Sequence, residues 1–259
     1  MTQSTMQTRQ SERGFTLVEL AIVMIIIGLL IGGILKGQEL INNARVSSAV
    51  TQIKGVEGAI NTFRDKYAAV PGDILNAGAR LPNCAGECAQ AGNGDSLIQV
   101  TTAAGNVGAA TADDEGGHAF VHLMASGVLS GPGVDTSIAS GSWAAATAYP
   151  DFNIGGKITI GYNTTDPTGT PGTDVLTGHY MGVGSIGGAA MGAETIAASQ
   201  AAAIDRKLDD GLPNAGSVRA TGGGASTTAA DCASGTTNAA VYNEGSDGKV
   251  CGLLVRTMN

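Results

Sequence analysis

One apolar run near the N-terminus constrains this chain more than any other feature. It extends from Phe15 to Leu35, and its single charged side chain is that of Glu19. At about 1.5 Å per residue, a helix of about 21 residues spans roughly the 30 Å hydrocarbon core of a bilayer. We therefore predict a transmembrane helix over 15–35. A carboxylate inside such a helix is unfavourable by a few kcal/mol, so Glu19 needs a partner or a position near the headgroups.

The polar segment 1–14 precedes the apolar run, and this order of segments is not that of a cleaved export signal. A signal peptide carries a shorter apolar region followed by small residues at its cleavage site, whereas here the polar segment comes first. A cut after Gly14 would remove a hydrophilic leader and leave the apolar helix as the new N-terminus. Arg9 and Arg13 precede the run. Because basic residues accumulate on the cytoplasmic side of a span, they predict a cytoplasmic N-terminus.

The string RGFTLVEL, Arg13 to Leu20, closely resembles the processing site of type IV prepilins and of the pseudopilins of type II secretion. Gly14, Phe15 and Glu19 fall on the three key positions of that site. The resemblance implies that a prepilin peptidase cuts between Gly14 and Phe15 and methylates the new amine. It also implies assembly into a filament, with other copies, other pilin-like subunits and an inner-membrane assembly platform as partners.

The same resemblance suggests a role for Glu19. Cleavage would create an α-amine at Phe15, which is largely protonated near neutral pH. In a staggered bundle of helices, the amine of one subunit could neutralise Glu19 of its neighbour in a low dielectric. We expect Glu19 to register assembly in this way. The alternative is an acid whose carboxylate reaches the headgroups of an ordinary single-pass anchor.

Beyond the apolar run, the helix is expected to continue with one apolar face. Apolar side chains recur at helical spacing up to the sequence YAAVPGD, where Pro71 and Gly72 end the pattern. We assign 36–70 to this amphipathic half, and we expect its stripe to pack in the core of a head domain. The stripe consists of Val46, Ala49, Val50, Ile53, Val56, Ile60, Phe63 and Tyr67.

The rest of the chain, 71–259, is predicted to form a globular α+β head. Apolar clusters separated by Gly, Pro, Asn and Asp are typical of antiparallel strands, and 221–240 is a low-complexity loop. The predicted class is pilin-like, with a long N-terminal helix packed on an antiparallel sheet and a disulfide-closed C-terminal loop. Helices are expected over 113–129 and 194–208, and strands within 143–162, 175–185 and 250–255.

All four cysteines follow the apolar run and would therefore lie on the oxidising side of a bacterial inner membrane. Four cysteines allow three connectivities. We favour Cys84 with Cys88, and Cys232 with Cys251. The second bond would close a loop of about 20 residues, worth roughly 3 kcal/mol, and it resembles the closed C-terminal loop of pilins. A four-cysteine zinc site fits poorly because the second pair is too widely spaced.

Three acids in IDRKLDDG, namely Asp205, Asp209 and Asp210, are the best candidates for a cofactor site. Oxygens that converge at a helix end could hold calcium, and major pseudopilins bind calcium in this general part of the head. The spacing is not that of an EF-hand loop. The alternative is a solvated turn in which Arg206 and Lys207 are the local partners of the acids. Asn243, Glu244 and Asp247 form a weaker second candidate.

His118 and His122 lie one helical turn apart, with Asp114 four residues before the first. The glutamate of a metalloprotease HExxH is replaced by Ala119, so we expect packing or surface roles for both histidines. No arrangement of Ser, His and Asp or of paired acids suggests catalysis, and we expect no enzyme activity. We also predict no nucleic-acid partner, because the chain has a net charge of −8, a pI near 4.7 and no basic cluster.

These features together predict a structural subunit of a type IV pilus-like filament, either major or minor. The large head favours a minor or tip position, and we favour a pilus over a pseudopilus. The first alternative is a pseudopilin of a type II secretion pseudopilus, and the second is a non-polymerising single-pass periplasmic binding protein. We expect the chain in the inner membrane before assembly, and in an extracellular pilus or a periplasmic pseudopilus afterwards.

Overall fold

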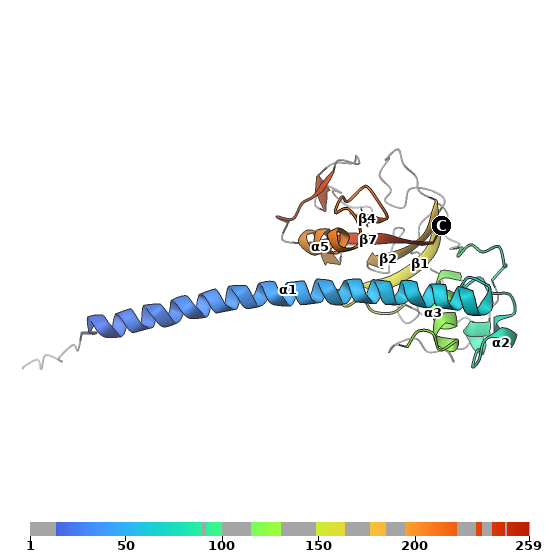
Figure 1. Cartoon of the computed structure of the whole chain (residues 1–259), viewed down its shortest axis with the longest axis horizontal. Coiled ribbons are helices and arrows are strands. Elements are labelled where there is room, and N and C mark those ends of the chain that lie inside the picture. Colours follow the sequence, from blue (N-terminus) through green and yellow to red (C-terminus); the bar gives the residue numbers. More distant parts are fainter. Residues whose placement is uncertain are drawn as a thin grey trace, which may run out of the picture. The chain divides into compact units, whose positions relative to one another are not determined.

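A computed structural model of the chain describes residues 14–89, 92–99, 115–130, 149–163, 177–184, 195–221, 232–234, 240–246 and 248–258. The chain forms two compact units, Met1–Asn43 and Ala44–Asn259. Helix α1, Leu17–Tyr67, is one continuous element of 51 residues that runs from the first unit into the second (Figure 1). The long N-terminal helix of the predicted class is therefore confirmed, while the domain boundaries at 14, 35 and 70 stay predictions.

The part of α1 in the second unit buries one face. Val46, Ile53 and Phe63 are among its buried residues, and they join one hydrophobic core with α3 and the sheet. Of the stripe expected from sequence, only Val50 and Tyr67 are half-buried. The helix ends at Tyr67 because Ala68 takes a φ of +48°, four residues before Gly72. Full burial of a side chain such as Ile53 contributes about 1.5–3 kcal/mol to folding.

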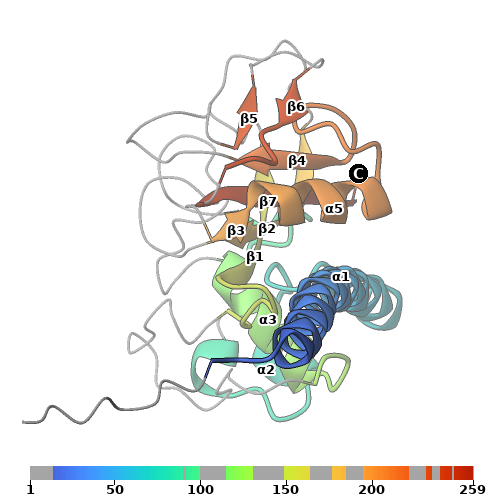
Figure 2. The ribbon, with the colours of Figure 1, turned by 90° about the vertical axis from the view of Figure 1, so that its left-hand side faces the viewer.

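The head contains one main antiparallel sheet with β7, Lys249–Met258, at its centre. Strand β7 pairs with β2, Gly178–Gly184, on one side, and with β3, Ile196–Ala197, and β4, Val218–Thr221, on the other (Figure 2). Strand β1, Lys157–Asn163, pairs with β2 at the edge. The predicted antiparallel sheet is confirmed, and its last strand extends beyond the expected 250–255 at both ends.

Helix α3, Glu115–Ala125, falls inside the helix expected over 113–129 and stops four residues before its predicted end. Gly127, with a φ of +72°, caps it, and the Val128 N–H donates to the Leu123 carbonyl at 3.1 Å. This is the glycine-terminated geometry that commonly closes a helix. Nine of the eleven residues of α3 are buried, so it is a core helix, and it lies beside the cyan end of α1 in Figure 1.

Helix α5, Ala198–Leu208, starts later than the expected residue 194 because Ile196 and Ala197 pair with β7 as strand β3. The remaining elements of the head are short. They are α2, Ala77–Arg80, the 3-10 turn η1, Gly86–Ala89, and the two-stranded ribbon of β5, Ala233–Ser234, with β6, Val241–Tyr242. The expected strand residues 143–148 and most of the low-complexity loop 221–240 lie outside the described residues.

Candidate functional site

The start of α1 is closed by a reciprocal cap between Thr16 and Glu19. The Glu19 Oε2 atom accepts hydrogen bonds from Thr16 N at 2.9 Å and from Thr16 Oγ1 at 2.8 Å. In return, Glu19 N donates to Thr16 Oγ1 at 3.3 Å. The string T-L-V-E thus forms a capping box, which satisfies backbone donors that every helix start leaves open. This capping role of Glu19 was not predicted, although Thr-x-x-Glu before an apolar run is a known signal of a capping box.

The cap leaves one oxygen of Glu19 available. Both bonds to the carboxylate from Thr16 end on Oε2, so Oε1 has no partner within the described part of the chain. Glu19 can therefore hold its own helix start and still accept a donor from outside. Its side chain lies in the first turn of α1, where a negative charge also complements the helix dipole.

The apolar residues that follow Glu19 have no cover within the chain. Leu29, for example, is 73% exposed, and none of the most apolar window of α1 is buried. In the described residues, α1 is the one helix that is long and apolar enough to cross a membrane, with a mean hydropathy of 2.8 in that window. An apolar surface of this size is unfavourable in water, so lipid or other protein chains must cover it.

Comparison with known proteins identifies this same segment. Residues 9–35 match the prokaryotic N-terminal methylation motif, which is the prepilin-type cleavage and methylation segment. No curated protein and no solved structure matches the chain. The motif indicates a type IV pilin-like or pseudopilin-like precursor, and it points to a structural class of protein rather than to an enzyme. The apolar helix and the motif together fit a membrane-anchored precursor.

Both favoured disulfide bonds are present in the head. Cys84 bonds Cys88 with an S–S distance of 2.01 Å, and Cys232 bonds Cys251 at 1.96 Å. Cys251 belongs to the central strand β7, so the second bond fastens the start of β5 to the middle of the main sheet. The disulfide-closed C-terminal region of the predicted class is thereby confirmed. No cysteine is free.

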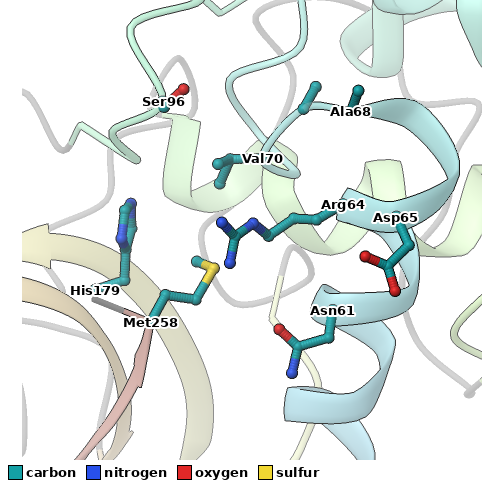
Figure 3. Close-up of a pocket in the computed structure, with 9 residues that line it drawn as sticks. Asn61, Arg64, Asp65, Ala68, Val70, Ser96, His179 and Met258 are labelled. Atoms are coloured by element: carbon teal, nitrogen blue, oxygen red, sulfur yellow. The ribbon is translucent and has the colours of Figure 1, made fainter.

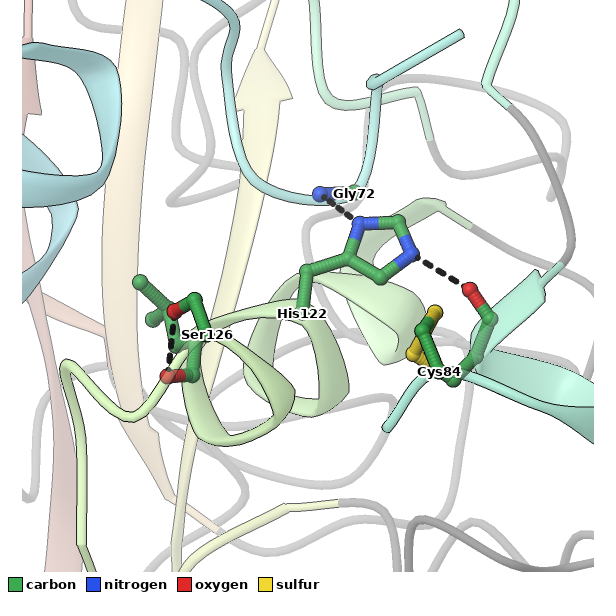
Figure 4. Close-up of a disulfide and its surroundings, with 6 residues drawn as sticks. Gly72, Cys84, His122 and Ser126 are labelled. Carbon is green, nitrogen blue, oxygen red and sulfur yellow. Dashed lines mark hydrogen bonds between the residues drawn. A yellow bond between two sulfur atoms is a disulfide. The ribbon is translucent and has the colours of Figure 1, made fainter. Parts of the chain in front are cut away.

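His122 links the first disulfide loop to the turn after α1. Its Nδ1 accepts a hydrogen bond from Gly72 N at 2.9 Å, so the ring proton lies on Nε2, which donates to the Cys88 carbonyl at 3.0 Å (Figure 4). Burial lowers the pKa of His122 to about 4, so the ring is neutral near pH 7. Both ring nitrogens are occupied, and the nearby sulfurs are bonded to each other. The geometry therefore gives His122 a packing role. Asp114, the acid noted near the two histidines, lies outside the described residues.

The structure brings Asp205, Asp209 and Asp210 together, with one carboxylate oxygen of each within 4.8 Å of the others. Asp205 is fully buried and accepts hydrogen bonds from Tyr242 OH at 2.9 Å and from Gly211 N at 3.3 Å. Burial raises its pKa to about 6. These bonds hold the turn after α5 against β6. The cluster therefore has a structural role, and calcium at this place stays a prediction.

The other two acids of this cluster also hold backbone. Asp209 Oδ2 accepts from Ser217 N and, at 3.2 Å, from Val218 N, while Asp210 Oδ1 accepts from Leu212 N at 2.8 Å. All three acids thus act as acceptors for the segment 211–218. A cation at this cluster would have to bind the carboxylate oxygens that remain exposed.

The expected pairing of these acids with Arg206 and Lys207 is wrong. Arg206 forms an ion pair with Glu244, and Lys207 Nζ donates to Ser47 Oγ on α1 at 2.7 Å. Both basic side chains therefore fasten α5 to other elements of the head. The ion pair also engages Glu244 of the weaker metal candidate, whose third member, Asp247, lies outside the described residues.

Proposed function

We propose that this chain is a subunit of a type IV pilus-like filament, in a major or minor position, processed between Gly14 and Phe15 by a prepilin peptidase. The subunit polymerises through the apolar half of α1 with copies of itself and other pilin-like subunits, at an inner-membrane assembly platform. One observation carries the proposal. A matched methylation motif heads a helix whose apolar residues are exposed throughout their most hydrophobic window.

The precursor resides in the bacterial inner membrane with a cytoplasmic N-terminus and an exported head. Two disulfide bonds support this orientation, because such bonds form and persist on the oxidising side of the membrane. After assembly the head is displayed on an extracellular pilus. A periplasmic pseudopilus of type II secretion is the second candidate, since the methylation motif is common to both kinds of filament.

Glu19 has two roles in this proposal, and three substitutions separate them. Glu19→Gln keeps a capping acceptor at the third helical position but removes the charge. Thr16→Ala removes the hydroxyl of the cap and leaves the carboxylate in place. Glu19→Ala removes both. Incorporation into sheared filaments and insertion into the inner membrane are measured for each variant by immunoblotting of the two fractions.

If Glu19 pairs with the amine of a neighbouring subunit, Glu19→Gln and Glu19→Ala abolish incorporation, whereas Thr16→Ala assembles. Membrane insertion persists in all three variants, because the two changes at position 19 remove a charge and Thr16→Ala removes a hydroxyl, and none of them makes the segment less apolar. Filaments of Glu19→Gln at the wild-type level would overturn the assembly role. Normal function without incorporation would favour the single-pass binding protein.

A further inference from the structure

A cavity of about 440 Å³ opens in the head beside the C-terminal end of α1. Arg64 and Asn61 line it from α1, Val70 from the turn that follows, His179 from the start of β2, and Met258 from the end of β7 (Figure 3). This volume falls in the lower part of the range of small-molecule pockets. Neither the methylation motif nor the exposed apolar helix accounts for it.

His179 contributes a buried imidazole to the lining of the cavity. The side chain is 5% exposed, and its Nε2 accepts a hydrogen bond from Ile98 N at 3.3 Å. The proton of the neutral ring therefore lies on Nδ1, which is buried and makes no hydrogen bond. A buried donor without an acceptor is unfavourable. The Tyr162 ring packs edge-on against the imidazole at 5.0 Å between centroids and supports its orientation.

Burial is the main reason why His179 is neutral. Burial lowers its pKa to about 4, and the positive charge of Arg64 acts in the same direction. The Ser96 carbonyl and the Asp95 carboxylate oppose this shift more weakly. His179 is therefore a neutral donor near pH 7.

Arg64 supplies a cation that has no anionic partner among the described residues. Its side chain reaches from α1 toward His179 and Met258 in Figure 3, and it forms no ion pair or hydrogen bond within the described part of the chain. Asp65 lines the same cavity, but its carboxylate makes no ion pair with the guanidinium there. A guanidinium presents several donors in a planar fork that matches a carboxylate.

We propose that this cavity binds a carboxylate carried on a short apolar body. Arg64 holds the carboxylate, the Ser96 hydroxyl and the Asn61 amide lie within the same lining as further hydrogen-bonding groups, and the buried His179 imidazole lies beside them. Met258, Val70 and Ala69 form an apolar wall for the body of the ligand. This wall favours a short organic acid or a peptide carboxyl end over inorganic phosphate. The site gives the head a recognition function beyond assembly.

The test uses the full chain in detergent, so it does not depend on filament formation. Binding of sodium butyrate is measured by calorimetry, with butyramide as the uncharged isostere and inorganic phosphate as the anion without an apolar body. N-acetyl-alanyl-alanine with a free carboxylate represents a peptide end. Saturable binding of butyrate with none of butyramide is expected. Tighter binding of the dipeptide than of butyrate would assign the site to a peptide end, and the reverse order to a free acid.

Arg64→Gln is expected to weaken butyrate binding at least about tenfold, because it removes the charge-assisted hydrogen bonds. Arg64 is exposed and glutamine is a good helix former, so the variant folds. Arg45→Gln makes the same charge change on α1 outside the cavity and should bind as the wild type does. Bound butyrate should also raise the pKa of His179, as measured by NMR.

Equal binding of butyrate and butyramide, equal affinities of the wild type and Arg64→Gln, or no binding of either carboxylate would overturn the proposal. Preferential binding of phosphate would also overturn it. An unchanged His179 pKa at saturating butyrate would remove His179 from the site.

Discussion

The two halves of α1 have the same backbone and opposite surroundings. In the first half, Ile26 is 50% exposed and its apolar neighbours are exposed as well, while in the second half Ile53 is completely buried in the core of the head. A continuous apolar surface needs cover from lipid or other chains, whereas a periodic stripe is covered by the chain's own sheet and helices. The first half is therefore built for contacts that the chain does not supply.

The most direct test of this difference in burial is to make the same substitution in both halves of α1. Ile53→Ala should lower the free energy of unfolding of the head by about 2–5 kcal/mol, because it leaves a cavity in a packed core. Ile26→Ala removes the same atoms from an exposed surface and should leave that free energy unchanged. Chemical denaturation of the full chain in detergent, followed by circular dichroism, measures both. Equal losses would contradict the division of α1 into self-covered and externally covered halves.

Removing each disulfide bond in turn tests how much that bond stabilises the head. Replacing Cys232 and Cys251 by alanine should lower the free energy of unfolding by roughly 3 kcal/mol. Replacing Cys84 and Cys88 should lower it by about 2 kcal/mol, because the loop that this bond closes is shorter. Thermal unfolding of the two double variants gives the order. The insertion of the apolar half into membranes should be the same in both. A larger loss from the Cys84–Cys88 pair would contradict the loop-closure argument.

The acid at the end of α5 offers a smaller test. Asp205→Asn should destabilise the head by about 1–3 kcal/mol, since the asparagine side chain cannot accept both the Tyr242 and the Gly211 hydrogen bonds on two oxygens. Asp210→Asn is the matched control on the exposed side of the cluster. If the cluster is structural only, a chelator leaves the melting temperature unchanged. A drop on addition of chelator would establish calcium at Asp205, Asp209 and Asp210.

A further effect is expected from pH at His122. Its pKa is lowered to about 4 in the folded head from an ordinary value near 6.5, so its contribution to stability is present above pH 6.5. This contribution is lost as the pH falls from 6.5 toward 4, because the unfolded chain takes up the proton first. NMR titration of the ring should show the low pKa, and a value near 6.5 would contradict the buried link between Gly72 and Cys88.

The sequence predicts what depends on local pattern, and much less of what depends on distant contacts. Apolar composition predicts the exposed half of α1, periodicity predicts its buried stripe, and Pro71-Gly72 places its end within a few residues. The later start of α5 depends instead on the pairing of Ile196 with Cys251, and the partner of Lys207 is Ser47, 160 residues away. Nothing local in IDRKLDDG indicates that contact.

The candidate sites divide in the same way. Gly14, Phe15 and Glu19 belong to one contiguous motif, so the sequence alone brings them together. The cavity at Arg64 depends on residues from α1, the turn after it, β2 and β7, which only the fold makes neighbours. The unpaired nitrogen of His179 has no signature in the sequence at all, because it results from where the Ile98 N–H lies.

In the proposed function, the exposed half of α1 becomes the N-terminus of the mature filament subunit. Mass spectrometry of the N-terminal peptide, taken separately from sheared extracellular material and from the inner membrane, tests it most directly. We expect a peptide that begins at a methylated Phe15 in the sheared material. Processed chain found in the envelope alone would point to a pseudopilus, and an intact Met1 leader in both fractions would contradict the account.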